Sequence, residues 1–423
     1  MNVLVIGSGG REHTLCWKIK QSKMLTKLYC APGNPGTASV AENVNLKVED
    51  VQGLLKFAKE NDIGLTVVGP EVPLSLGIVD EFEKAGLKIF GPCREAALLE
   101  SSKSFAKEFM RRFKIPTAVY DIFYNITDAM EYLKDKKFPV VIKADGLAAG
   151  KGVVIPKSLE EAKRHLSEIM EQKIFGGAGT KVVIEEFMEG EEATFLVFCD
   201  GDNIIPMVGS QDHKRVFDND EGPNTGGMGA YSPAPVLNKA LENDIINKVI
   251  LPAISGMSMV GKKYKGVLYA GMMVTKNGLK VVEFNCRFGD PETQVVLPRL
   301  KSDLLEIMLA SAEGQLHTVK AEWDERPAVC IVLASGGYPG KYENGKEIKG
   351  LEEAGKLKDV TVFHAGTALK DGKIVTNGGR VLGVTALGDD IKDALDKAYA
   401  AVKLISFDGM HYRKDIAKRA FNR

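Results

Sequence analysis

The first part of the chain alternates short hydrophobic runs with amphipathic stretches. Hydrophobic runs at residues 3–6, 27–30, 64–68 and 87–90 each end at glycine or proline, and residues 11–20 between the first two have a helical pattern. Runs of this length and ending indicate strands. Strands that alternate with helices are typical of a parallel sheet with crossover helices, so the pattern predicts an α/β fold here.

The central part of the chain has a different pattern. Residues 101–113 form an apolar-periodic segment that Ser101 or Ser102 is suited to cap, which predicts a helix. Strand-like runs follow at residues 139–143, 153–155 and 182–186. Residues 210–235 are polar and glycine-bearing, and a loop of that length inside a compact domain is usually functional or mobile.

A hairpin and a third unit complete the chain. Asn277-Gly278 lies between hydrophobic residues 269–275 and 279–284, which is a strong signal for a two-residue hairpin turn. Beyond a polar linker, a new set of elements begins near Pro327. Its predicted strands and helix cover residues 329–334, 380–385 and 391–404.

Composition and charge narrow the class of protein. The 423 residues are 44% hydrophobic and 26% charged, as in ordinary globular proteins, and 56 basic residues balance 56 acidic ones. A nucleic-acid binder usually shows a basic excess, so we expect no nucleic-acid partner. No apolar run approaches a membrane span, and we expect no membrane partner. The six cysteines are scattered without a CxxC pair, which favours a reduced, cytoplasmic location.

The first glycine-rich motif follows the first predicted strand. Residues 7–12 read GSGGRE and precede a helix, so backbone N–H groups and the helix N-terminus could hold an anion. The dinucleotide fingerprint would need a third glycine where Glu12 stands, and an acidic residue after the second strand, so NAD is not expected. A phosphate site and a tight turn that binds nothing both fit this motif.

A second glycine-rich motif lies between two predicted strands. Lys143 and Lys151 bracket Gly146 and Gly150, and Gly152 stands where a Walker A loop carries the serine or threonine that holds Mg²⁺. A loop of this kind can fold over a triphosphate, with the lysines supplying positive charge. The alternative is a flexible surface hairpin with solvated lysines.

A third motif is weaker. Glu185, Glu186 and Phe187 end a predicted strand, and Glu192 follows closely. A strand end with free backbone groups can read adenine, and a carboxylate beyond it can bind ribose hydroxyls. A plain strand followed by a solvated acidic turn is the alternative for this segment taken alone.

The most informative motif lies on the second strand of the predicted hairpin. Side chains alternate along a strand, so Glu283 and Asn285 point to the same side. Mg²⁺ that carries phosphates favours one or two such oxygen ligands, and Arg287 adds a fork for a carboxylate or phosphoryl group. The exposed face of a hairpin is the alternative, but it leaves the dense polar cluster after Arg287 unexplained.

Together these motifs resemble the ATP-grasp superfamily and, within it, the glycinamide ribonucleotide synthetase (phosphoribosylamine–glycine ligase) family. The resemblance extends from end to end of the chain. It rests on VIGSGGRE (residues 5–12), APGNPGT (31–37), GPE (69–71), KADGLAAGKG (143–152), DHKR (212–215), NTGGMG (224–229) and RFGDPETQ (287–294).

The resemblance implies an α/β and α+β multidomain fold. Residues 1–101 would form a Rossmann-like substrate domain, residues 102–324 an ATP-grasp core with a lid inserted near residues 120–190, and residues 325–423 a small α/β C-terminal domain. It implies ATP-dependent ligation of glycine to 5-phosphoribosylamine through a glycyl phosphate, as the second step of purine biosynthesis, with Mg²⁺ or Mn²⁺. We expect a monomer.

The resemblance also implies roles for individual residues. Catalysis is expected from Arg287, Lys143, Lys151 and Asp212, and metal binding from Glu283 and Asn285. Nucleotide binding is expected from Lys103, Lys143, Gly146, Gly150, Lys151, Gly152, Glu185, Glu186, Phe187, Glu192 and Lys214. Substrate binding is expected from Gly9, Gly10, Arg11, Glu12, Asn34, Pro70, Glu71, Gly226, Gly227, Arg287, Gly289, Asp290 and Glu292.

One position departs from the superfamily pattern. Many ATP-grasp enzymes carry another acidic metal ligand on the partner strand of the hairpin, and the equivalent position here falls near Gly271. A second metal would therefore depend on phosphates and water. Two other functions stay open at this point: an ATP-grasp ligase for another carboxylate or amine, and a non-catalytic nucleotide-binding module.

Overall fold

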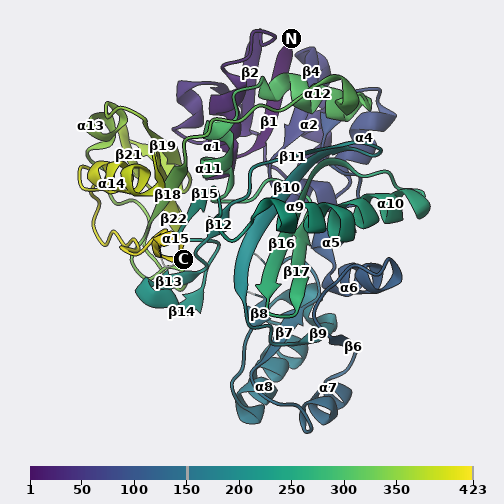
Figure 1. Ribbon diagram of the computed structural model, residues 1–423. Coiled ribbons are helices and arrows are strands. Elements are labelled where there is room, and N and C mark those ends of the chain that lie inside the picture. The colour runs from purple at the N-terminus through teal and green to yellow at the C-terminus, as the bar shows by residue number, and fades with distance from the viewer. Residues whose placement is uncertain (149–151, 422–423) are drawn as a thin grey trace.

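The computed structural model describes residues 1–148 and 152–421. Its N-terminal part is a five-stranded, all-parallel sheet in the order β3-β2-β1-β4-β5. The α/β prediction for this part is confirmed, because a helix follows most strands (Figure 1). The elements are β1 Asn2–Gly7, α1 Gly10–Ile19, β2 Lys27–Pro32, β3 Glu42–Asn43, α2 Val51–Glu60, β4 Ile63–Val68, α3 Glu71–Ser75, α4 Ile78–Lys84 and β5 Ile89–Phe90.

A separate lobe follows the helix α6 (Lys103–Arg112), and Ser102 caps that helix by accepting the Phe105 N–H. The lobe is an antiparallel sheet in the order β6-β9-β7-β8, and it appears at the bottom of Figure 1. It has a hydrophobic cluster of its own, which includes Leu133, Ile142 and Leu166. Its elements are β6 Tyr120–Phe123, α7 Ile126–Leu133, β7 Val140–Ala144, β8 Val153–Val154, α8 Leu159–Leu166 and β9 Val182–Glu186.

The central sheet is antiparallel in the order β11-β10-β16-β17. Its strands are β10 Glu191–Asp200, β11 Ile204–Pro206, β16 Lys265–Thr275 and β17 Gly278–Asn285. The predicted hairpin is confirmed, but Thr275 pairs with Gly278, so the two turn residues are Lys276 and Asn277. Gly278 is already in the strand at φ +107°, a conformation that glycine adopts without strain.

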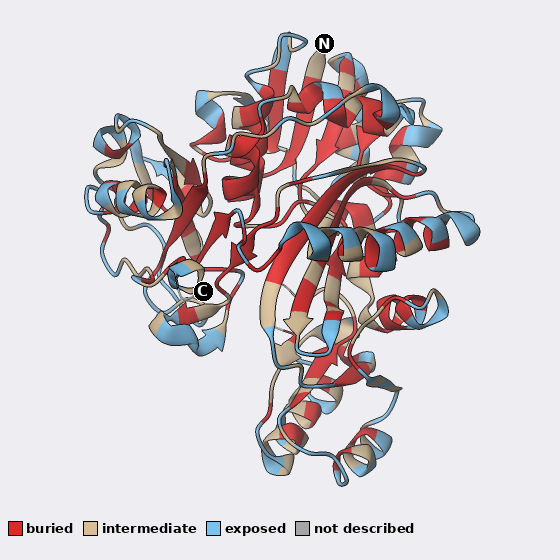
Figure 2. Ribbon diagram, viewed as in Figure 1, coloured by how far each residue is buried: buried red, intermediate tan, exposed pale blue. Residues whose placement is uncertain are grey.

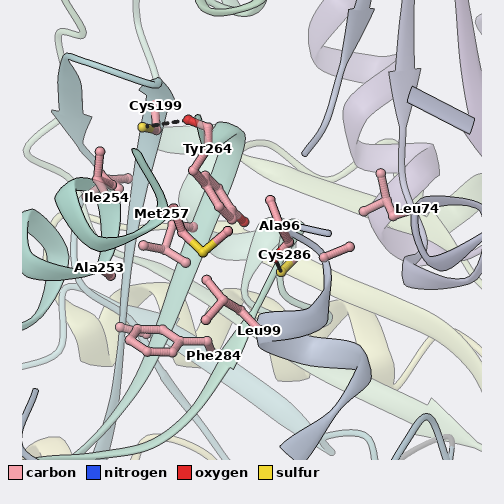
Figure 3. Close-up of a cluster of buried hydrophobic side chains, with 14 of the residues drawn as sticks. Leu74, Ala96, Leu99, Cys199, Ala253, Ile254, Met257, Tyr264, Phe284 and Cys286 are labelled. Atoms are coloured by element: carbon pink, nitrogen blue, oxygen red, sulfur yellow. Dashed lines mark hydrogen bonds between the residues drawn. The ribbon is translucent and has the colours of Figure 1, made fainter. Parts of the chain in front are cut away.

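The central sheet and the N-terminal part share a hydrophobic core. Figure 3 shows Tyr264, Met257 and Phe284 near Leu99, with Leu74 on the far side of Cys286. Leu99 and Leu74 come from helices near the N-terminal sheet. The helix over residues 239–259 covers this side and consists of α9 Lys239–Ile245, a π-helical turn Ile246–Ile250 and α10 Leu251–Met259. Because one core joins the two parts, we expect them to move as one unit.

The C-terminal sheet has the order β12-β15-β18-β22-β19. Two of its strands, β12 (Gln211–Asp212) and β15 (Gly229–Ser232), come from the segment that was expected to be a long loop. That expectation was wrong. The local sequence pattern does not reveal β15, because its backbone partner is β18 (Ala328–Ala334), which lies far along the chain. The same segment also forms the small hairpin of β13 (Arg215–Phe217) and β14 (Glu221–Asn224).

The remaining elements complete the layers around these sheets. Buried residues follow the strands, while exposed residues lie on the outer helices and at the tip of the lower lobe (Figure 2). No helix in the described residues is long and apolar enough to cross a membrane. The remaining elements include α5 Leu98–Ser101, α11 Thr293–Val296, α12 Leu304–Glu313, α13 Leu351–Gly355, β19 Val360–His364, β20 Thr367–Lys370, β21 Lys373–Thr376, β22 Arg380–Leu387, α14 Ile391–Val402 and α15 Lys418–Phe421.

Candidate active site

A pocket of about 480 Å³ lies where the N-terminal sheet, the lower lobe, the central sheet and the C-terminal sheet meet. It gathers most of the charged residues that the sequence motifs singled out. The predicted residues on its wall are Arg11, Glu71, Lys103, Lys143, Gly152, Glu185, Glu186, Phe187, Glu192, Asp212, Lys214, Gly226, Glu283, Asn285, Arg287, Asp290 and Glu292.

The remaining predicted residues fall into two groups. Gly150 and Lys151 lie outside the described residues. The rest lie behind the wall or beside it: Gly9, Gly10, Glu12, Asn34, Pro70, Gly146, Gly227 and Gly289.

Three buried or half-buried lysines line one end of the pocket. Lys143 Nζ lies 2.8 Å and Lys107 Nζ 3.1 Å from the two carboxylate oxygens of Glu185. Lys103 Nζ donates to the carbonyl of Gly146 at 2.8 Å, at the start of the glycine-rich segment. Burial lowers the pKa of Lys107 to about 8 and also lowers that of Lys103. Two of these lysines share the single carboxylate of Glu185 and the third bonds to a carbonyl, so this part of the wall suits a polyanion.

Glu283 and Asn285 lie side by side at the end of β17, as the alternation of the strand predicted. The Asn285 amide donates to Glu283 Oε1 at 3.5 Å. Burial alone would raise the pKa of Glu283, but nearby cations, Lys214 and Lys143 first among them, lower it. The carboxylate is thus ionised. Described residues contain no cluster of three or more His, Cys, Asp or Glu side chains suited to a metal. Two oxygen ligands fit a Mg²⁺ ion that phosphates and water also hold.

Arg287 lies between two carboxylates. Its Nη2 is 2.8 Å from Glu100 Oε1, and its Nε is 3.4 Å from Glu71 Oε2. A third contact joins Nη2 to the Asn285 side-chain oxygen at 3.4 Å. Arg287 therefore links the metal-type pair on β17 to the N-terminal part of the protein.

Glu100 is a buried carboxyl that the motif analysis did not identify. The Cys286 N–H donates to its Oε2 at 2.7 Å. Burial raises the pKa of Glu100 to about 7, although Arg287 opposes this. A raised pKa in the folded state means that folding favours the protonated form. The stability that protonated Glu100 contributes is therefore fully present below the unfolded pKa of about 4.3, and it is lost as the pH rises through 7.

We expect Glu100→Gln, which resembles the protonated form, to remove this pH dependence. Relative to Glu100→Gln, the free energy of unfolding of the wild type should fall by up to about 3 kcal/mol between pH 4.5 and pH 8. Urea unfolding of both proteins at several pH values measures the difference. A difference that stays constant with pH would show that Arg287 keeps Glu100 ionised throughout.

Another part of the pocket wall is rich in carboxylates. Asp212 Oδ2 pairs with Lys214 Nζ at 2.8 Å, and Glu292 Oε1 accepts from the Tyr269 hydroxyl at 2.8 Å. Thr194 donates to the same Glu292 oxygen at 3.2 Å. Burial, and then the nearby Asp212, raise the pKa of Glu292. Such a group of acidic side chains suits an amino group.

Two N–H groups at the glycine turn after β1 are already hydrogen-bonded within the protein, which the sequence did not indicate. The Gly9 N–H donates to Glu12 Oε2 at 2.7 Å, and the Arg11 N–H donates to Asp290 Oδ2 at 3.3 Å. The positive end of α1 is thus already matched by two carboxylates. Arg11 Nε, 2.6 Å from Glu12 Oε1, holds that carboxylate in place.

The predicted substrate residue Asn34 is hydrogen-bonded to other residues of the protein. Its amide donates to the carbonyls of Ser8 at 2.7 Å and His364 at 3.0 Å. Its side-chain oxygen accepts the N–H groups of Gly36 and Thr37. All these contacts are within the protein, so Asn34 joins the loop after β2 to the C-terminal sheet instead of facing the pocket.

The two carboxylates of the strand-end motif, Glu185 and Glu186, have different partners. Glu185 points to the lysines, whereas Glu186 lies 2.5 Å from Lys280 Nζ and accepts the Val119 N–H at 3.0 Å. Phe187 is 41% exposed at the mouth of the pocket. Lys280 extends from β17, so the Glu186 pair links the lower lobe to the central sheet.

Glu100, Lys107 and Arg380 also line the pocket and were not predicted from the sequence. Lys107 lies one helical turn after Lys103 on α6, and that i, i+4 spacing was a signal that could have identified it. Arg380 follows Gly378-Gly379 at the start of β22, which was a local signal that could have identified it. Glu100 lies in no glycine-rich or strand-end motif, so its position could not be inferred locally.

Comparison with known proteins supports one family for the whole chain. Models of the phosphoribosylglycinamide synthetase N domain, ATP-grasp (A) domain and C domain match residues 1–100, 101–293 and 328–419. A phosphoribosylamine–glycine ligase of Vibrio vulnificus (strain YJ016) is 54% identical over 426 residues, which cover 100% of this chain and 99% of that protein. One from Caldanaerobacter subterraneus subsp. tengcongensis is 52% identical over 417 residues, 99% of each chain.

Solved structures agree with this result. The crystal structure of a phosphoribosylamine–glycine ligase from Thermotoga maritima superimposes with a TM-score of 0.87 and 34% identity, and covers 99% of this chain and 100% of that one. A biotin carboxylase from Campylobacter jejuni shares the fold alone, with a TM-score of 0.74 and 15% identity over 97% of this chain and 92% of that one. The resemblance drawn from the motifs is therefore confirmed, and the chain belongs to the phosphoribosylglycinamide synthetase family of ATP-grasp ligases.

Proposed function

We propose that this protein joins glycine to 5-phosphoribosylamine at the expense of ATP and forms glycinamide ribonucleotide, ADP and phosphate. The observation that carries the proposal is the division of the pocket. Lysines and the Glu283–Asn285 pair suit a nucleotide triphosphate on one part of the wall, Arg287 lies beside that pair, and a group of carboxylates forms another part. The relatives that are more than half identical carry the name of this activity.

The chemistry requires activation of a carboxylate. A carboxylate oxygen is a poor leaving group, so an amine does not displace it in neutral water. In the first step a glycine carboxylate oxygen attacks the γ-phosphorus of ATP, the bond to the β-phosphate oxygen breaks, and glycyl phosphate and ADP form. In the second step the amine nitrogen attacks the glycyl carbonyl carbon, the carbon–oxygen bond to phosphate breaks, and the amine loses a proton.

Side chains of the lysine end would position the triphosphate. Phosphoryl transfer needs alignment and charge neutralisation more than covalent help, and Lys103 and Lys143 have the charge and burial for that role. Lys151 belongs to the same proposal but lies outside the described residues. No side-chain nucleophile is required.

Glu283 and Asn285 would hold Mg²⁺ or Mn²⁺, and the ion would neutralise charge on the phosphates of ATP. Arg287 would orient the glycine carboxylate, because its guanidinium lies beside both the metal-type pair and the N-terminal part. Asp212 and Glu292 would face the amino groups of the substrates. The lower lobe has its own core, so it could close over the pocket as a unit and protect glycyl phosphate from water.

Release of ADP tests the proposal against its rivals. We expect ADP release that requires both glycine and phosphoribosylamine and that stops when alanine or serine replaces glycine. Equal rates with another amino acid would favour a ligase for a different carboxylate. Binding of ATP without turnover for any pair of substrates would favour a non-catalytic nucleotide-binding module.

Gly9→Val is expected to weaken use of phosphoribosylamine and to leave ATP binding intact. A Cβ at residue 9 would lie 2.9 Å from Glu12 Oε2, so valine must displace the carboxylate that Arg11 holds. We expect the KM for phosphoribosylamine to rise by about tenfold and the KM for ATP to stay within about twofold. Initial rates with each substrate varied in turn provide the measurement.

Gly355→Val is the matched control, because nothing lies within 4 Å of a Cβ at that position. Thermal unfolding of both variants checks that the domain still folds. A folded Gly9→Val enzyme that loses ATP affinity and keeps its affinity for the amine would contradict the division of roles between the two parts of the pocket wall.

A further inference from the structure

Arg380 is a charged residue of the C-terminal sheet whose side chain reaches the pocket. It is the first residue of β22 and pairs with Ala334 of β18. The register of the two strands shifts between Leu333 and Ala334. Its side chain is 22% exposed and lines the same pocket as Glu283 and Arg287. None of the sequence motifs contains it.

The guanidinium makes a concentrated set of contacts through one nitrogen. Nη1 donates to the carbonyl of Gly226 at 2.7 Å and to that of Asp290 at 2.8 Å. The same nitrogen is 3.4 Å from the Gly227 carbonyl and 3.5 Å from Asp290 Oδ1. Arg380 therefore ties together two loops that are more than sixty residues apart in sequence.

Both loops are shaped to accept this side chain. A Cβ at Gly226 would lie 2.9 Å from Arg380 Cζ, so residue 226 must be glycine while the guanidinium is there. Gly227 has φ +118°, and a Cβ there would meet the ring of Pro291 at 2.5 Å. A second residue of the C-terminal part holds the same loop, because the Gly226 N–H donates to the Tyr338 hydroxyl at 3.0 Å.

Asp290 extends this network to the N-terminal part. Its Oδ2 accepts the Arg11 N–H at the start of α1, and its Oδ1 accepts from the Gln294 amide at 2.9 Å. Burial would raise the pKa of Asp290, but Arg380 and Arg11 lower it, so the carboxylate is ionised between two arginines. The three parts of the protein thus meet at one aspartate.

We propose that Arg380 is a positioning residue: it holds the Gly226–Gly227 loop and the Asp290 loop against each other and so sets the shape of the pocket wall where phosphoribosylamine binds. This inference rests on the proposed function for the identity of the substrate. The C-terminal sheet then contributes to amine binding through Arg380 without any chemistry of its own. The lysine end, which lies on α6 and the lower lobe, is outside its reach.

The test compares Arg380→Ala with Arg326→Ala. Arg326 is another arginine of the C-terminal part, but it pairs with Asp324 and Asp359 and does not line the pocket. We expect Arg380→Ala to raise the KM for phosphoribosylamine by about tenfold or more and to leave the KM for ATP within about twofold. Arg326→Ala should match the wild type in both.

Hydrogen–deuterium exchange supplies a readout that does not depend on activity. We expect faster exchange in Arg380→Ala over residues 224–229, where the Gly226 and Met228 N–H groups are hydrogen-bonded, and no change over β9. A rise in KM without faster exchange would overturn the positioning role, because it would indicate direct contact with substrate. An unchanged KM, or the same effect in Arg326→Ala, would overturn it as well.

Arg380→Lys keeps the test decisive if the alanine variant does not fold. Lysine keeps the charge and three donors on one nitrogen but is shorter than arginine, so we expect a KM between those of the wild type and the alanine variant. Wild-type behaviour of Arg380→Lys, together with unchanged exchange in Tyr338→Phe, would contradict the proposal. Absence of ligation in the wild type would instead refute the proposed function and would be seen before any variant is compared.

Discussion

Glu283→Gln is expected to lower kcat by about a hundredfold or more, with little effect on stability. Glu283 is the charged member of the pair on β17, and Lys214, Lys143 and Lys103 keep its carboxylate ionised. Glutamine has the same shape but no charge, so it would be a far weaker Mg²⁺ ligand. The turnover of ADP release at a series of Mg²⁺ concentrations measures the effect.

The control for this variant is Glu306→Gln, which makes the same substitution at an exposed glutamate on α12. Thermal unfolding without ligands should give the two variants similar midpoints. Near-normal turnover of Glu283→Gln with an unchanged Mg²⁺ dependence would show that the pair on β17 does not hold the metal.

Lys143→Met is expected to raise the KM for ATP by about tenfold or more and to lower kcat by a similar or larger factor. The Lys143 ammonium is buried on β7, 2.8 Å from Glu185 and 3.1 Å from the Val282 carbonyl, where it faces the pocket. Methionine keeps most of the side-chain volume and removes the charge. Glu185 keeps Lys107 as a partner, so we expect the fold to persist.

Lys134→Met is the matched control, because Lys134 is the exposed C-cap residue of α7 in the same lobe and pairs with Glu131, three residues before it. It should retain wild-type kinetics. Direct titration with a non-hydrolysable ATP analogue separates the loss of binding from the loss of chemistry. If Lys143→Met binds and turns over ATP as the wild type does, the lysine end is not the phosphate site.

Most regular elements were predictable from the sequence. The predicted strand at residues 182–186 is β9. The helices predicted at residues 11–20 and 391–404 are α1 (Gly10–Ile19) and α14 (Ile391–Val402). Their hydrophobic positions repeat with the period of the element, and the two helices begin after Gly9 and Asp390, residue types that favour a helix N-cap. The strand at residues 87–90 is shorter than predicted: Ile89 and Phe90 are paired in register with β4.

The candidate site was predictable as a set of residue types but not as an arrangement. Alternation along one strand placed Glu283 and Asn285 together correctly, since both belong to the same local element. The turn after β1 was different: its N–H groups looked free in the sequence, but Asp290, far along the chain, occupies one of them. Asn34 likewise bonds to His364 across the molecule.

The sequence by itself determined the type of most helices and strands, the residues that can carry phosphate and metal chemistry, and the family. These follow from local periodicity and from motifs that are short and continuous. The tertiary structure alone decided that residues 211–232 supply strands to the C-terminal sheet, that Arg287 lies between Glu71 and Glu100, and that Arg380 reaches Gly226. Each of these depends on partners brought together by packing of separate units, and a contact between distant residues leaves no period in the chain that could reveal it.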